Sequence, residues 1–145
     1  MSLKPLQSLL VEPDQSGAFY LTASDLGPLL EAADGLGFRC VAVDLADCTD
    51  KAGLMARLAD GFSFPPGLGH NWDALADALG DLSWLPAEGY VLGLHAPGAL
   101  RAADPDSFAT LVAVLEGAAL VWRDIDRPFW AFIALPDDEF EALAP

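Results

Sequence analysis

Two aspartates, Asp73 and Asp77, lie four residues apart in the stretch 64–86, which reads FPPGLGHNWDALADALGDLSWLP. Side chains at this spacing lie one turn apart on a helix, and two like charges there destabilise it by about 0.2–0.5 kcal/mol. Between Arg57 and Arg101 the sequence contains no lysine or arginine. An acidic surface without internal counter-charge attracts a basic partner, although a solvated face of an acidic protein has the same pattern.

A shaped loop and a short helix are the elements expected to hold this pair. Pro65 and Pro66 restrict φ and lack amide donors, which excludes regular structure there. Gly67 and Gly69 permit backbone conformations that other residues avoid. Asn71 provides an N-cap, because its side-chain oxygen accepts an amide hydrogen bond from the first turn. The spacing then predicts a helix whose apolar face and closing glycine are Trp72, Leu75, Ala76, Leu79 and Gly80.

The same stretch raises two chemical alternatives. His70, Asp73 and Asp77 are ligand types that zinc or manganese accepts, but no second cluster in the sequence completes a coordination shell. Two carboxylates could act as a glycosidase pair if a cleft held them about 5–9 Å apart. The sequence supplies neither a nucleophile elbow nor a phosphate-binding loop. We therefore predict no metal, no cofactor and no enzymatic activity.

The overall charge argues against several classes of partner. The 145 residues carry a formal charge of −15, with 7 basic and 22 acidic side chains. Such a chain repels the phosphates of nucleic acids and anionic membrane surfaces, and it shows no signal-peptide pattern and no long apolar window. Cys40 and Cys48 form no disulfide framework, and Cys40 is expected to be buried. These features predict a cytoplasmic protein that binds neither nucleic acid nor membrane.

Strand and helix patterns alternate along the chain. Apolar β-forming runs predict strands at 38–45, 90–95 and 128–135, and His95, at the end of the second, is expected to be a hydrogen-bonded core residue. Helices are expected at 24–34, 51–60 and from residue 105 onward, with caps at Ser24, at Thr49 or Asp50, and at Asp104. Short edge strands are expected at 9–11 and 18–21. This alternation predicts an α/β fold with a small parallel sheet.

The run Gly69-x-Asn71-x-Asp73-Ala74-Leu75-x-Asp77-x-Leu79, followed by Asp81-Leu82-Ser83-Trp84-Leu85-Pro86, resembles the barstar family of small cytoplasmic ribonuclease inhibitors. The resemblance implies a three-stranded parallel sheet covered by helices over residues 38–135. Residues 1–37 would then be an N-terminal extension and 136–145 an acidic tail.

The resemblance also implies a partner and a contact surface. The partner would be a basic microbial ribonuclease, of the guanyl-specific type or a toxin domain, whose phosphate-binding cations pair with carboxylates of the inhibitor. The residues predicted to contact this partner are Gly67, Leu68, Gly69, His70, Asn71, Asp73, Ala76, Asp77, Asp81 and Glu116.

The sequence differs from the family pattern at two positions of this surface. Gly67 replaces an aromatic residue of the well-known inhibitor, and Ala76 replaces a tryptophan. Two hypotheses therefore remain. The first is an immunity-type inhibitor that blocks the active site of a basic ribonuclease with an acidic helix and a loop, without chemistry of its own. The second is a non-inhibitory interaction or regulatory module on the same fold.

Overall fold

The computed structural model describes residues 4–136. Four strands form one sheet: β1 (Ala18–Thr22), β2 (Arg39–Asp44), β3 (Tyr90–His95) and β4 (Phe129–Leu135). Their order across the sheet is β1-β4-β3-β2, and all three neighbouring pairs are parallel. Because parallel strands cannot be joined by tight hairpins, the chain crosses over the sheet between them, and helices occupy these crossovers.

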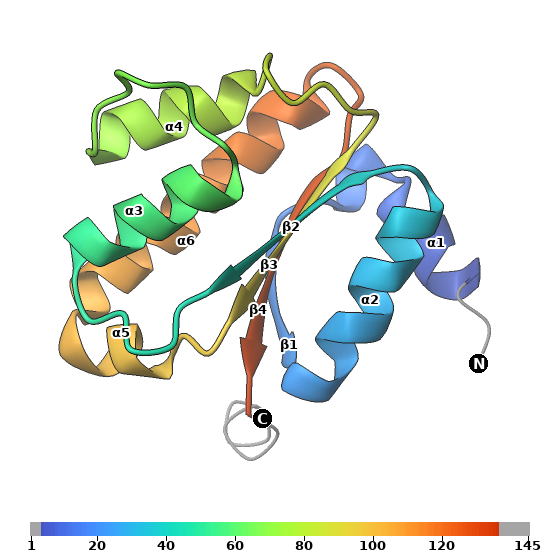
Figure 1. The fold of residues 1–145 in the computed structure, drawn as a ribbon. Coiled ribbons are helices and arrows are strands. Elements are labelled where there is room, and N and C mark those ends of the chain that lie inside the picture. Colours follow the sequence, from blue (N-terminus) through green and yellow to red (C-terminus); the bar gives the residue numbers. More distant parts are fainter. Residues whose placement is uncertain (1–3, 137–145) are drawn as a thin grey trace.

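Helices cover both faces of the sheet and make a three-layer sandwich (Figure 1). A short helix α1 (Lys4–Leu10) and a single turn η1 (Pro13–Gln15) lead into β1, and α2 (Ala23–Gly35) follows it. Helices α1 and α2 lie on one side of the sheet (Figure 1). The other side is covered by four helices: α3 (Lys51–Gly61), α4 (Trp72–Asp81), α5 (Gly98–Ala103) and α6 (Pro105–Arg123).

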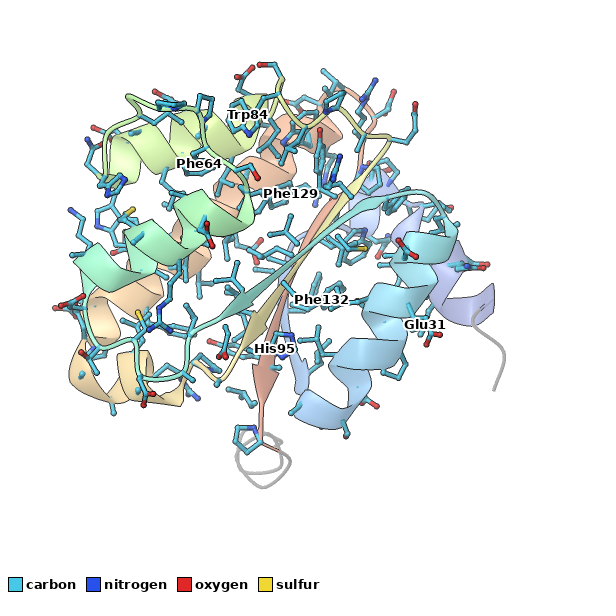
Figure 2. All side chains as sticks on the ribbon, in the orientation of Figure 1. Glu31, Phe64, Trp84, His95, Phe129 and Phe132 are labelled. Atoms are coloured by element: carbon cyan, nitrogen blue, oxygen red, sulfur yellow. The ribbon has the colours of Figure 1, made fainter. Side chains whose placement is uncertain are left out.

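Strand β4 contributes side chains to two separate cores because successive residues of a strand point to opposite faces. Phe129 packs in the core under α3–α6, whereas Trp130 and Phe132 pack in the core under α1 and α2. Figure 2 shows Phe129 and Phe132 on opposite sides of the sheet. Every residue of β4 is buried, which explains its uninterrupted apolar sequence.

Most of the elements predicted from residue 38 onward are confirmed. Strands β2, β3 and β4 and helices α3, α4 and α6 lie within one or two residues of the expected ranges. Asp50 and Asp104 act as N-caps and accept hydrogen bonds from the amides of Gly53 (2.8 Å) and Ser107 (3.2 Å). These signals are local, since each capping aspartate binds an amide only three residues further along the chain.

Three expectations about elements are wrong. The sheet has four strands rather than the three that the resemblance implied, because the edge strand expected at 18–21 is present as β1 and pairs with β4 from Ala18 to Thr22. Residues 9–11 form no strand; they lie at and just after the end of α1. Helix α2 begins at Ala23 with Thr22 as N-cap and no side-chain cap bond, so Ser24 is not its cap. The structure also contains α5, which was not predicted from the sequence.

Two side chains expected in the core are only partly buried. Cys40 is half-buried, and Cys48 is the cysteine that packs in the core. Burial and the nearby charge of Asp34 raise the pKa of the Cys40 thiol, which keeps it protonated and poorly nucleophilic near neutral pH. His95 lies at the end of β3 and is partly exposed, so it is not the core histidine that its apolar neighbours suggested.

Residues before the predicted domain contribute directly to the sheet and to its second core. Strand β1 is one edge of the sheet, and Leu26 and Leu29 of α2 pack against Val91 and Trp130. Residues 4–37 therefore cover a sheet face that would otherwise be exposed.

Helix α6 is the most apolar helix of the described chain. By length and composition alone it would be long and apolar enough to cross a membrane. However, Leu111, Leu115 and Trp122 of this helix pack in the core under α3–α6, and buried core helices meet the same criterion. Its outer side also carries large apolar side chains, since Leu120 and Val121 are more than half exposed.

Candidate functional site

Helix α4 presents the two aspartates and is held by a local cap and a packed face. The Asn71 side-chain oxygen accepts a hydrogen bond from the Ala74 amide at 2.8 Å, as predicted. Leu75, Ala78 and Leu79 are buried against the core. The helix does not stop at Gly80; it continues through Asp81 and ends at a residue with left-handed backbone, Leu82 (φ 45°).

Two tryptophan side chains fix α4 and the preceding loop to the rest of the molecule. The indole nitrogen of Trp122 in α6 donates a hydrogen bond to the Leu79 carbonyl at 2.7 Å. The indole nitrogen of Trp84 donates to the Phe62 carbonyl at 2.8 Å, and its ring lies edge-on to Phe64 with 5.8 Å between centroids (Figure 2). Loop and helix are therefore anchored at both ends before any partner binds.

Asp73 and Asp77 are exposed on the outer side of α4. Neither has an ion-pair partner within the part of the chain that the structure describes. One cation does approach the beginning of the helix, because the Lys51 ammonium lies 5.7 Å from the ring centroid of Trp72. This lysine could not be anticipated from the stretch without basic residues between positions 57 and 101, because it lies before that stretch, at the start of α3.

The loop before α4 is exposed and its shape depends on two glycines. Gly67 has a φ of +95°, a conformation that side-chain-bearing residues rarely adopt. A Cβ atom on Gly69 would approach the side-chain nitrogen of the capping Asn71 to 2.9 Å. Gly67, Gly69, His70 and Asn71 are exposed, and Leu68 is half-buried. The predicted contact loop is thus brought next to the acidic helix.

Two other predicted contact residues have partners within the chain. The Glu116 carboxylate accepts a hydrogen bond from the Ala18 amide at 3.0 Å and so holds the edge strand β1. Asp81, at the end of α4, accepts a hydrogen bond from the Ser83 hydroxyl at 3.0 Å and stays exposed. Glu116 is exposed but, unlike Asp73 and Asp77, it is hydrogen-bonded to the sheet edge.

Ala76 does not lie on the buried face of α4, contrary to its predicted position; it is exposed, and Ala78 packs inward instead. Ala76 borders a groove between α4 and α6, with a volume of about 440 Å³, which the sequence analysis did not identify. The signal that could have indicated it is the apolar outer face of α6, where Gly117, Leu120 and Val121 are exposed. The groove is lined by Ala76, Asp77, Thr110, Ala113, Val114, Gly117, Ala118 and Val121.

The described side chains suit charge recognition better than metal binding. Within residues 4–136, no three histidine, cysteine, aspartate or glutamate side chains lie close enough together to hold a metal ion. His70 therefore does not complete a metal site with Asp73 and Asp77 there. What the geometry offers is a pair of unpaired carboxylates on a capped and packed helix.

The fold and this surface define a small α/β protein with an acidic recognition helix. The sequence profile of the family described as Barstar (barnase inhibitor) matches residues 38–134, from just before β2 almost to the end of β4. The chain belongs to the barstar family, whose members are ribonuclease inhibitors rather than enzymes. None of the curated proteins compared with the chain matches it.

Proposed function

We propose that this protein is an immunity-type inhibitor that blocks the active site of a basic ribonuclease with Asp73 and Asp77 of α4 and the loop 67–71. The observation that carries the proposal is the pair of exposed carboxylates without a partner in the described chain. An acid that contributes little to folding and stays unpaired is available to a partner.

The basic side chains of the protein support this assignment because several are used internally. Arg57, Arg123 and Arg127 each donate hydrogen bonds to backbone carbonyl oxygens of the chain, at 2.6–3.3 Å. Lys51 lies over an aromatic ring. These cations neutralise backbone dipoles rather than the acids of α4, so the negative field of the helix is left for a cationic partner.

The proposed mechanism is substrate mimicry without chemistry. A ribonuclease must present lysine, arginine or histidine side chains to bind phosphate, and carboxylates make charge-assisted hydrogen bonds with the same groups. Because α4 is capped by Asn71 and held by Trp122, the helix backbone that carries the two carboxylates is in place before binding. Such preorganisation reduces the entropy cost of association. No cofactor and no catalytic group is needed.

The partner and the location follow from the same reasoning. A ribonuclease of the guanyl-specific type, or the ribonuclease domain of a toxin, would be harmful where it is made. We propose that this inhibitor acts in the cytoplasm of a bacterium, in complex with such an enzyme. Its charge of −15 would speed association with a basic protein and repel nucleic acids.

Calorimetric titration against a panel of microbial ribonucleases, at two salt concentrations and with an RNA-cleavage assay, tests this proposal. We expect tight binding by at least one enzyme, loss of its RNA cleavage, and weaker binding at high salt because charge attraction is screened. Failure of every enzyme to bind would contradict the ribonuclease assignment.

A second candidate function is a non-inhibitory interaction module, favoured by the exposed Ala76 and Gly67 where an inhibitor of this family carries aromatic residues. Partner capture with the intact protein distinguishes it. A captured partner without a nuclease active site, together with no inhibition of ribonucleases, would favour the module. Capture of a ribonuclease alone would favour the inhibitor.

A further inference from the structure

The groove between α4 and α6 is an open apolar surface directly beside one of the two free carboxylates. Asp77 is part of its wall, and the remaining lining is almost entirely alanine, glycine and valine. Ala76, Ala113, Gly117 and Val121 are exposed. Because Asp77 belongs to both, the groove adjoins the acidic face of α4.

The stability of the fold does not require a glycine at position 117, where the groove lacks a side chain. This glycine lies inside α6, and no atom of a neighbouring group lies within 4 Å of the position that a Cβ would take. An interior helix glycine destabilises a helix by roughly 1 kcal/mol relative to alanine. Neither close packing nor backbone conformation requires the glycine, and its lack of a side chain leaves the groove open at this position.

Large apolar side chains are exposed at the end of α6, where Val121 lines the groove and Leu120 and Ile125 lie near it in the sequence. Leu120 and Val121 of α6 are 54% and 51% exposed, and Ile125, just after the helix, is 59% exposed. Exposed apolar side chains that adjoin one another indicate an interaction surface. The volume of about 440 Å³ lies within the range of pockets that hold a bulky group.

The charged residue among those that line the groove is acidic, and two further acids lie near its lining residues in the sequence. Asp77 lines it, Asp106 precedes the lining residue Thr110 by one helical turn, and Asp124 follows the lining residue Val121 at the end of α6. The nearest basic residue in sequence, Arg123, donates its hydrogen bonds to the Pro13 and Ser16 carbonyls of the segment before β1. A cationic segment is therefore the complementary occupant of this region.

We propose that the groove receives a bulky apolar side chain, preferably aromatic, that lies next to a lysine or arginine on the surface of the ribonuclease partner. This inference rests on the proposed function and specifies the chemistry of its partner: the cation pairs with Asp77 while the apolar neighbour fills the space over Gly117 and Ala76. In this arrangement the partner supplies the aromatic group that the inhibitor itself lacks at position 76.

The direct test uses two dipeptide amides, Arg-Trp-amide and Arg-Gly-amide, titrated into the intact 15N-labelled protein and followed by NMR. We expect Arg-Trp-amide to shift the amide signals of Ala76, Gly117 and Val121, and to bind about tenfold or more tightly than Arg-Gly-amide. Burial of one large apolar side chain supports a factor of at least this size. Equal responses to both peptides, or shifts confined to Asp73 and Asp77, would overturn the proposal.

Two matched variants give the specificity control. Gly117→Leu fills the groove with a side chain that meets no neighbouring atom at its Cβ, and it should abolish the difference between the two peptides. Ala109→Leu adds an apolar group at an exposed position of the same helix outside the groove, and it should leave both titrations unchanged. An unchanged Arg-Trp-amide titration in Gly117→Leu would exclude the groove as the binding site.

The same variants separate this inference from the proposed function. If a ribonuclease binds and Gly117→Leu weakens binding about tenfold or more while Ala109→Leu does not, both are supported. If Asp77→Asn weakens ribonuclease binding but Gly117→Leu has no effect, the inhibitor function stands and the groove inference is wrong. If no ribonuclease binds, the proposed function fails, and the peptide titration still decides whether the groove accepts a cationic aromatic segment.

Discussion

The acidic residues of this protein divide into those that stabilise the fold and those that do not. Asp50, Asp104 and Glu116 each accept a hydrogen bond from a backbone amide. Asp73 and Asp77 are exposed and have no ion-pair partner in the described chain. The residue type does not distinguish the two groups. An acid stabilises the fold only where a backbone amide lies close enough to donate a hydrogen bond to it.

Replacement of Asp77 by asparagine should affect binding and stability in opposite directions. Removing the charge relieves its repulsion with Asp73, so the free energy of unfolding should stay the same or rise by up to about 0.5 kcal/mol. Binding to a ribonuclease should weaken by roughly 2 kcal/mol or more, about 30-fold, because a cation in the enzyme would lose its partner. Urea unfolding and calorimetric titration measure the two effects.

Glu31→Gln is the matched control for this prediction. Glu31 is an exposed acid on α2, on the opposite side of the sheet from α4 (Figure 2). Both variants lose one negative charge, so they change long-range attraction to a similar extent. A Glu31→Gln variant that lost as much affinity as Asp77→Asn would argue for general charge attraction rather than a defined contact.

Asn71→Ala tests the cap of the acidic helix. The substitution removes the acceptor of the Ala74 amide and should lower the free energy of unfolding by about 1 kcal/mol. Asn71→Asp keeps an acceptor at the same position, so its stability should be close to that of the wild type. Equal unfolding midpoints for Asn71→Ala and the wild type in urea would show that the cap contributes nothing to stability.

At the scale of elements, the pairing of α4 with α6 determines the geometry of the surface. Trp122 of α6 is buried and bonds the last turns of α4 through the Leu79 carbonyl. The small residues Ala76 and Gly117 leave the groove open between the two helices. Consequently one side of α4 packs in the core, whereas the exposed side carries Asp73 and Asp77 and borders the groove through Ala76 and Asp77.

Two glycine-to-alanine substitutions should have opposite effects on stability. Gly117→Ala meets no atom within 4 Å and should raise the free energy of unfolding by up to about 1 kcal/mol through helix propensity. Gly61→Ala, at the end of α3, would place its Cβ 2.8 Å from a methyl carbon of Val43 and should destabilise the protein. Thermal or urea unfolding measures both changes. Changes of the same sign in the free energy of unfolding of the two variants would contradict this prediction.

For the whole molecule, the chain before the family match is required to cover one face of the sheet. Strand β1 is hydrogen-bonded to β4, and α2 covers the core that contains Trp130 and Phe132. Without these elements β4 would become an edge strand with the apolar sequence FWAFIAL. Exposed apolar edge strands promote aggregation.

Deletion of residues 1–37 should therefore abolish cooperative folding. We expect the truncated protein to elute as aggregates in size-exclusion chromatography and to lose near-ultraviolet circular dichroism, whereas the full chain remains monodisperse. A truncated monomer with a cooperative unfolding transition would demonstrate that the family-matched region folds independently of β1 and α2.

The sequence determined the local elements and the acidic motif. Asn71, Asp50 and Asp104 could be recognised as caps, and Asp73 and Asp77 as an exposed pair, because each depends on residues within one or two helical turns. Strands β3 and β4 were evident from continuous apolar runs, since buried parallel strands need no polar alternation.

Which distant residues meet is evident from the folded chain alone. The pairing of β1 with β4 joins segments more than a hundred residues apart, as does the hydrogen bond from Arg123 to the Ser16 carbonyl. The placement of Glu116 at the Ala18 amide and the groove between α4 and α6 likewise depend on how helices lie across the sheet. Such contacts leave no periodic pattern in the sequence, because they are set by topology and packing rather than by local backbone preference.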